Sequence, residues 1–300
     1  MVRGPRTALR PRAGKRVNTP ASKPSGGRTS GLLQRVATAL ALLPVVLGAT
    51  WFAPAPWLYL LFAVVGVLAA NEWSAMMRLA ARGRAAYTAL SAVLLGLAWL
   101  LRAQWPWFAA AGVLWWLLAA CLIPGFPADL QRLRPNRIAL GLLGPVLWVP
   151  AVLSLTMART MPDGPLRVTF VLVLVWAADV GAFIAGRNFG RHKLAPNVSP
   201  GKTWEGVLGG MLLVALWAAA AGSYFFAIDS VRGLLALLAL AVAAGALSVV
   251  GDLGISMFKR LAGLKDSGRL LPGHGGVLDR VDSLLAAAPV LALGWYWLRP

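Results

Sequence analysis

Nine long apolar stretches, separated by short polar ones, run through almost the whole chain. They cover residues 33–53, 57–77, 86–101, 106–123, 138–158, 168–186, 204–227, 232–250 and 283–298. Most are about as long as a helix must be to cross the hydrocarbon core of a bilayer, which is about 30 Å thick. Inside that core only helices and closed barrels satisfy their backbone hydrogen-bonding groups. The pattern therefore predicts an all-α, polytopic integral membrane protein with about nine transmembrane helices.

The composition excludes an ordinary soluble domain. Of all residues, 59% are hydrophobic and only 13% are charged, whereas soluble domains are about 45–50% apolar and about 25% charged. A chain with half the usual charge cannot cover a water-facing surface.

The net charge of +19, from 29 Lys and Arg against 10 Asp and Glu, is best explained by membrane topology. Lys and Arg concentrate in the cytoplasmic connections of membrane proteins. If the N-terminus is cytoplasmic, 24 of the 29 lie on the cytoplasmic side. We therefore expect no nucleic-acid partner. The expected segments are a disordered basic cytoplasmic tail (1–32), N-terminal transmembrane helices (33–160) and a C-terminal catalytic transmembrane region (161–300) with cytoplasmic loops 187–203 and 251–282.

Four of the ten acidic residues lie between residues 252 and 282. They share this stretch with five basic residues, His274 and the pair Gly275–Gly276. Carboxylates and cations without a Cys or His cluster suit Mg²⁺, which binds one or two carboxylates together with waters and substrate phosphates. Asp252 and Asp279 are the candidate metal ligands. The candidate phosphate-binding cations are Lys259, Arg260, Lys265, Arg269 and Arg280; a solvated loop of mixed charge is the alternative.

Two further features point to the same chemistry. Asp179 lies inside the apolar stretch 168–186, where an ionisable residue is functional by default, although a hydrogen bond to a neighbouring helix is the alternative. In the other large connection, Ser199, Lys202 and Thr203 precede a helix start and could contact a phosphate. Lys202 and Thr203 do not form a Walker motif, because Pro196 stands where that motif requires glycine.

The C-terminal residues resemble the phosphatidate cytidylyltransferase (CDP-diacylglycerol synthase) family. The match includes Ser256-x-Phe258-Lys259-Arg260, Lys265-Asp266-x-Gly268 and Leu271-Pro272-x-His274-Gly275-Gly276-Val277-x-Asp279-Arg280-Val281-Asp282. Upstream, Asp179, Gly186-Arg187 and the run from Ser199 to Gly206 are also similar to the family. The resemblance covers the C-terminal half strongly and the first 160 residues only by hydropathy.

This resemblance implies an integral membrane enzyme that requires Mg²⁺ and converts CTP and phosphatidate to CDP-diacylglycerol and diphosphate. Asp252 and Asp279 would hold the metal. Lys202, Lys259, Arg260, Lys265 and Arg280 would bind the triphosphate or the lipid headgroup, and His274, Gly275 and Gly276 would shape the phosphate or cytidine pocket. Asp179 would add a metal contact or orient Lys202, and Asp282 would orient Arg280.

The expected location is a bacterial inner membrane, with the active site facing the cytoplasm. The expected partners are CTP, phosphatidate and membrane lipids, and a homodimer stays open. The alternative functions are a polytopic transporter, whose polar residues would lie at the bilayer midplane, and another CTP-dependent lipid enzyme such as a polyprenol kinase.

Overall fold

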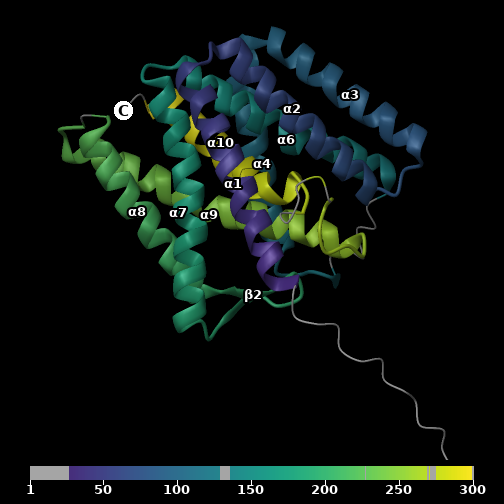
Figure 1. Cartoon of the computed structure of the whole chain (residues 1–300). Coiled ribbons are helices and arrows are strands. Elements are labelled where there is room, and N and C mark those ends of the chain that lie inside the picture. The colour runs from purple at the N-terminus through teal and green to yellow at the C-terminus, as the bar shows by residue number, and fades with distance from the viewer. Residues whose placement is uncertain (1–26, 129–135, 227, 269, 271–274, 299–300) are drawn as a thin grey trace, which may run out of the picture.

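Each of the nine predicted spans lies on an α-helix in the computed structural model, which describes residues 27–128, 136–226, 228–268, 270 and 275–298. The helices are α1 (Gly27–Phe52), α2 (Ala55–Met76), α3 (Ala81–Leu100), α4 (Trp105–Leu122), α6 (Arg137–Thr160), α7 (Gly164–Phe189), α8 (Trp204–Tyr224), α9 (Val231–Leu261) and α10 (Leu278–Leu298) (Figure 1). Seven helical segments of the described chain are long and apolar enough to cross a membrane. The all-α membrane class is confirmed; the predicted tail lies outside the described residues as far as residue 26.

The two large polar connections are shorter than predicted. Helix α7 continues to Phe189, and the first connection folds into an antiparallel hairpin of β1 (Lys193–Ala195) and β2 (Ser199–Thr203). Helix α9 continues to Leu261, so Asp252 lies within the helix and not in a loop. The apolar run ends near residue 250, but Leu253, Ile255 and Met257 are still buried. One face of α9 therefore stays apolar and packed beyond residue 250, and the helix continues although its average hydropathy falls.

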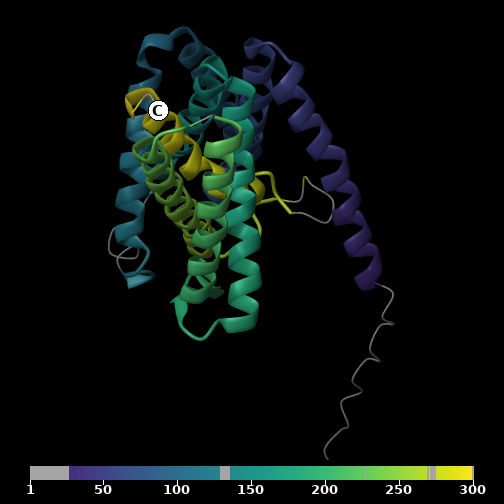
Figure 2. The same cartoon turned by 90° about the vertical axis from the view of Figure 1, so that its left-hand side faces the viewer.

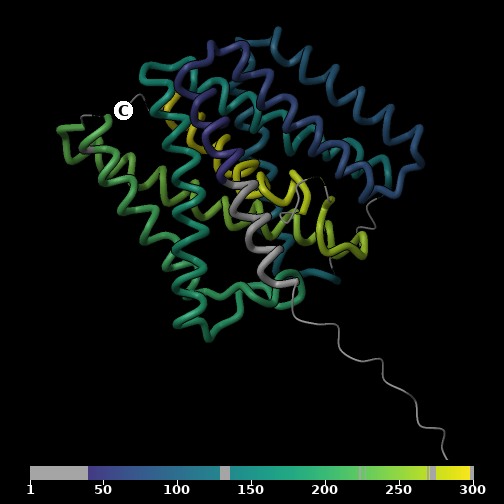
Figure 3. Tube along the Cα trace, in the orientation of Figure 1, coloured from purple at the N-terminus to yellow at the C-terminus, as the bar shows by residue number. Residues whose placement is uncertain are grey.

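Helix α10 lies at the centre of the molecule. It packs against α2, α4, α6, α7 and α9, and residues 285–292 are all buried. Figures 1 and 3 show this yellow segment between α7 and α8 on one side and α2, α3 and α6 on the other, with α9 crossing below it. Its first turn carries Asp279, so the central helix delivers the predicted metal ligand.

Helices α7 and α8 pack closely through glycines. A Cβ atom at Gly181 would lie 2.5 Å from the carbonyl oxygen of Gly209, and one at Gly210 would lie 2.7 Å from that of Ala178. The hairpin lies at the end of this helix pair, as the turned view in Figure 2 shows. Because β2 leads directly into α8, the packing holds the hairpin near Asp179 on α7.

Candidate functional site

One face of α9 carries three polar side chains of the predicted site. Asp252, Ser256 and Lys259 are spaced by four and three residues, so they lie on the same side of the helix. The Ser256 hydroxyl donates to Asp252 Oδ1 at 3.3 Å, and Lys202 Nζ on the hairpin lies 2.7 Å from Asp252 Oδ2. The two polar connections that the sequence placed on one side of the membrane therefore meet at Asp252.

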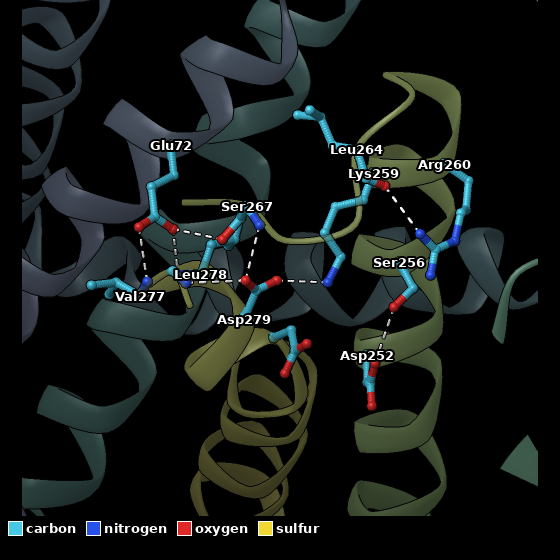
Figure 4. Close-up of polar contacts among 12 residues, drawn as sticks. Glu72, Asp252, Ser256, Lys259, Arg260, Leu264, Ser267, Val277, Leu278 and Asp279 are labelled. Carbon is cyan, nitrogen blue, oxygen red and sulfur yellow. Dashed lines mark hydrogen bonds and ion pairs between the residues drawn. The ribbon is translucent and has the colours of Figure 1, made fainter. Parts of the chain in front are cut away.

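The carboxylate of Asp279 makes three hydrogen bonds (Figure 4). Its Oδ1 accepts a hydrogen bond from Lys259 Nζ at 2.6 Å, and its Oδ2 accepts from the backbone N–H groups of Ser267 at 2.9 Å and Gly276 at 3.1 Å. Asp279 comes before residue 283 in the chain, so it lies outside the expected membrane span 283–298. Burial alone would raise the pKa of Asp279, but the Lys259 ammonium and the two N–H donors outweigh it and hold the pKa below its usual value. Asp279 is therefore an ionised, fixed group.

Two more carboxylates lie close enough to Asp252 to interact with it electrostatically, those of Asp179 and Asp282. Asp282 is buried and accepts a hydrogen bond from the backbone N–H of Ser283 at 2.8 Å. Within the described residues it makes no hydrogen bond or ion pair with Arg280, so its predicted role in orienting Arg280 has no contact to support it. The structure instead gathers Asp282 and Asp179 around Asp252, where like charges favour a bound cation.

Two cavities meet at Asp179. A polar one of about 380 Å³ is lined by Asp179, Arg187, Lys202, Thr203 and Asp252, among others. The second, of about 580 Å³, is an apolar groove between α1, α2, α7 and α10, with Asp179 and Arg280 as its charged residues. Arg280 is exposed. The site can therefore hold a polar ligand and an apolar one side by side.

Not all of the remaining predicted residues line these cavities. The hydroxyl of Thr203 caps α8 by accepting from the backbone N–H of Gly206 at 3.1 Å, and Ser199, at the other end of β2, does not line the polar cavity. Arg260 donates to the carbonyl oxygens of Val198 at 3.3 Å and Leu264 at 3.1 Å, so it ties the hairpin to the end of α9. Lys265 is exposed. His274 and Arg269 lie outside the described residues.

The glycine pair permits a turn and a close approach. Gly275 has φ +82°, in the left-handed region that favours glycine. At Gly276 a Cβ atom would lie 2.0 Å from Ser267 Oγ and 2.4 Å from Glu72 Oε2. The pair therefore brings the loop backbone against other residues of the site and lets Gly276 reach Asp279.

Glu72 on α2 also belongs to this group of residues, although it is not among the site residues predicted from the sequence. Its buried carboxylate accepts hydrogen bonds from Ser267 Oγ at 2.7 Å and from the backbone N–H groups of Val277 and Leu278, both at 2.9 Å (Figure 4). The signal that singled out Asp179, an acid inside a predicted span, applies equally to Glu72 in the stretch 57–77.

The acidic residues fit a magnesium ion that shares its ligands with substrate. The described residues contain no cluster of three or more His, Cys, Asp or Glu side chains with metal-binding geometry, but Mg²⁺ binds through one or two carboxylates together with phosphates and water. Among the residues that the structure describes, Asp252 Oδ1 has only the 3.3 Å contact with Ser256. Asp279 uses three of the roughly four lone-pair sites of a carboxylate and keeps one.

Comparison with known proteins identifies relatives along nearly the whole chain. The cytidylyltransferase family model matches residues 33–297. The chain is 42% identical over 268 residues to the phosphatidate cytidylyltransferase of Pseudomonas aeruginosa, covering 87% of this chain and 96% of that protein. It is 35% identical over 272 residues to the protein of the same name from Brucella suis, covering 88% and 93% respectively.

Proposed function

The chain belongs to the cytidylyltransferase family, and from that premise we propose that the site between the hairpin, α7, α9 and α10 transfers CMP from CTP to phosphatidate. The products are CDP-diacylglycerol and diphosphate. The observation that carries the assignment of this site is the junction of a polar cavity and an apolar groove at Asp179. A reaction between a water-soluble nucleotide and a membrane lipid needs such a junction.

The charged residues suggest where each substrate binds. The polar cavity, with Lys202 beside Asp252, takes the triphosphate of CTP. The apolar groove takes the acyl chains of phosphatidate, and Arg280 binds its phosphate at the charged end of the groove. Arginine suits this role because its planar guanidinium can donate two parallel hydrogen bonds to phosphate oxygens.

In the chemical step, a phosphate oxygen of phosphatidate forms a bond to the α-phosphorus of CTP. The bond from that phosphorus to the bridging oxygen of the β-phosphate breaks, and its electron pair leaves with diphosphate. No general base is required, because a phosphate monoester already carries an anionic oxygen at neutral pH. The protein positions two anions and neutralises the charge that develops between them.

Lys202 and Lys259 are prepared for this neutralisation. Each ammonium group is held by one carboxylate, Asp252 or Asp279, and an ammonium has three donors. Each lysine can therefore keep its carboxylate partner and donate to a phosphate oxygen. Asp252 and Asp279, with Asp282 beside them, would hold Mg²⁺, which would supply positive charge to polarise the substrate phosphates.

We also propose that the site faces the cytoplasm, at the inner membrane of a bacterium. The positive-inside distribution of Lys and Arg supports this orientation, and the relatives described above are bacterial.

The function is tested with purified protein in detergent, labelled CTP and phosphatidate. Labelled CDP-diacylglycerol and diphosphate should form with Mg²⁺ and should not form with a chelator. Transfer of labelled phosphate, and not of CMP, to a lipid would refute the reaction. So would the absence of product under conditions in which the Pseudomonas aeruginosa enzyme is active.

The placement of the substrates is tested by a pair of variants. Lys202→Ala should raise KM for CTP more than KM for phosphatidate, and Arg280→Ala should do the opposite. Arg191→Ala removes an exposed charge just before the same hairpin, outside both cavities, and should change neither. Equal effects of Lys202→Ala and Arg280→Ala on both KM values would contradict the placement.

A further inference from the structure

We propose that Glu72 is a positioning residue for the reaction, a carboxylate from α2 that fixes the loop between α9 and α10 so that Asp279 meets Lys259. This inference rests on the proposed role of Asp279. It assigns part of the site to the N-terminal half of the chain, in which no sequence pattern indicated a catalytic residue.

The contacts of Glu72 join the two sides of the loop. One carboxylate oxygen, Oε2, accepts from the Ser267 hydroxyl and from the Leu278 backbone N–H, and Oε1 accepts from the Val277 N–H. Ser267 lies early in the loop, whereas Val277 directly precedes α10 and Leu278 is its first residue. Glu72 therefore caps the N-terminus of α10, where free N–H groups favour a negative charge.

The same segment holds Asp279. Ser267 donates its hydroxyl to Glu72 and its backbone N–H to Asp279, so it links the two carboxylates through one residue. Gly276, which donates the other backbone hydrogen bond to Asp279, lies against Glu72. Both backbone donors of Asp279 thus come from segments that contact Glu72, whereas Asp279 itself bonds Lys259 and not Glu72.

The glycines of the loop show how closely Glu72 fits. A Cβ atom at Gly268 would lie 2.4 Å, 2.7 Å and 3.1 Å from Oε1, Cδ and Cγ of Glu72, and these are its three nearest neighbours. Burying a carboxylate costs free energy unless it is hydrogen-bonded. A smaller polar side chain would be enough to cap the end of the helix. A glutamate enclosed by two glycines and three donors is a specific fit.

The main test is Glu72→Gln, which keeps the shape but puts an amide group opposite a backbone N–H donor. If Glu72 positions the site, kcat should fall by about 10–100-fold, as for loss of a residue that orients a metal ligand. The KM values should stay within roughly twofold, because Glu72 does not line either of the two cavities assigned to the substrates. A merely structural role would lower the melting temperature and leave kcat of the folded fraction unchanged.

Ser230→Ala is the matched control, since Ser230 caps α9 by accepting from the Gly233 N–H at 3.1 Å. That cap is 22 residues before Asp252 in sequence, roughly 33 Å along the helix. Both substitutions remove a helix cap, but only Glu72→Gln should lower kcat.

A second test uses the contact with Gly268. Gly268→Ala should lower kcat in the natural chain, but should add little in a Glu72→Ala background, where the side chain it would meet is gone. If the two substitutions lowered kcat additively, the contact between residue 268 and Glu72 would not explain the loss.

The variant Asp279→Asn separates the two proposals. If Asp279→Asn is inactive while Glu72→Gln has normal kcat, Glu72 has no positioning role. If Asp279→Asn is active, the proposed site is wrong.

Discussion

Replacing Asp279 by asparagine should cost both activity and stability, and the two losses can be separated. The asparagine carbonyl can still accept from the backbone N–H groups of Ser267 and Gly276. Its amide NH₂ group then faces the ammonium of Lys259, which was 2.6 Å from Asp279 Oδ1. A donor faces a donor, and the Lys259 side chain, only 9% exposed, loses its anionic partner.

The free-energy loss can be estimated from that geometry. Removing one partner of a buried ion pair costs about 3–5 kcal/mol, because the other charge is left uncompensated. Because the pKa of Asp279 is held below its usual value, this stabilisation should persist as pH falls to about 5 and disappear only as Asp279 protonates at lower pH.

A double variant then distinguishes stability from catalysis. Lys259→Met together with Asp279→Asn removes the ammonium that opposes the new amide, so thermal unfolding should recover most of the lost stability. Activity should not recover, and the deficit should exceed the roughly 10–100-fold of a residue that only orients a metal ligand. A double variant no more stable than Asp279→Asn would refute the ion-pair reasoning, and one with restored turnover would remove Asp279 from the reaction.

Three further outcomes follow from the fold. Leu43→Trp should narrow the apolar groove and raise KM for long-chain phosphatidate about tenfold, since misfit in an apolar pocket costs about 1–3 kcal/mol, whereas Leu97→Trp, on an exposed part of α3, should not. Gly181→Ala should lower the melting temperature by overpacking α7 against α8, and Gly96→Ala, which meets no atom within 4 Å, should leave it unchanged or raise it. Deleting residues 1–26 should preserve specific activity in the CTP assay; a loss matching Asp279→Asn would make the tail catalytic.

The sequence alone singles out Asp252 and Asp279 but not Glu72, and it does not show how the charged groups pair. Asp252 and Asp279 stand out because acids are scarce, and Lys202 because of the motif that precedes α8. In the structure Lys202 pairs with Asp252, 50 residues later in the chain, and Lys259 pairs with Asp279, 20 residues later. Hydropathy also ended α9 too early, because it averages over a helix whose buried face stays apolar beyond Asp252. Pairing and helix length depend on tertiary packing, which local composition does not contain.

Glu72 shows why the N-terminal half belongs to the site. Its partners lie 195 to 206 residues later in the chain, so no local pattern connects them. The loop from α9 to α10 contains glycines where Glu72 approaches, and at Gly268 and Gly276 any side chain would overlap its carboxylate. Those glycines therefore fit a loop that closes around a group supplied by α2. With the positioning role proposed for Glu72, the chemistry of the C-terminal site depends on a helix that hydropathy alone marks as a membrane anchor.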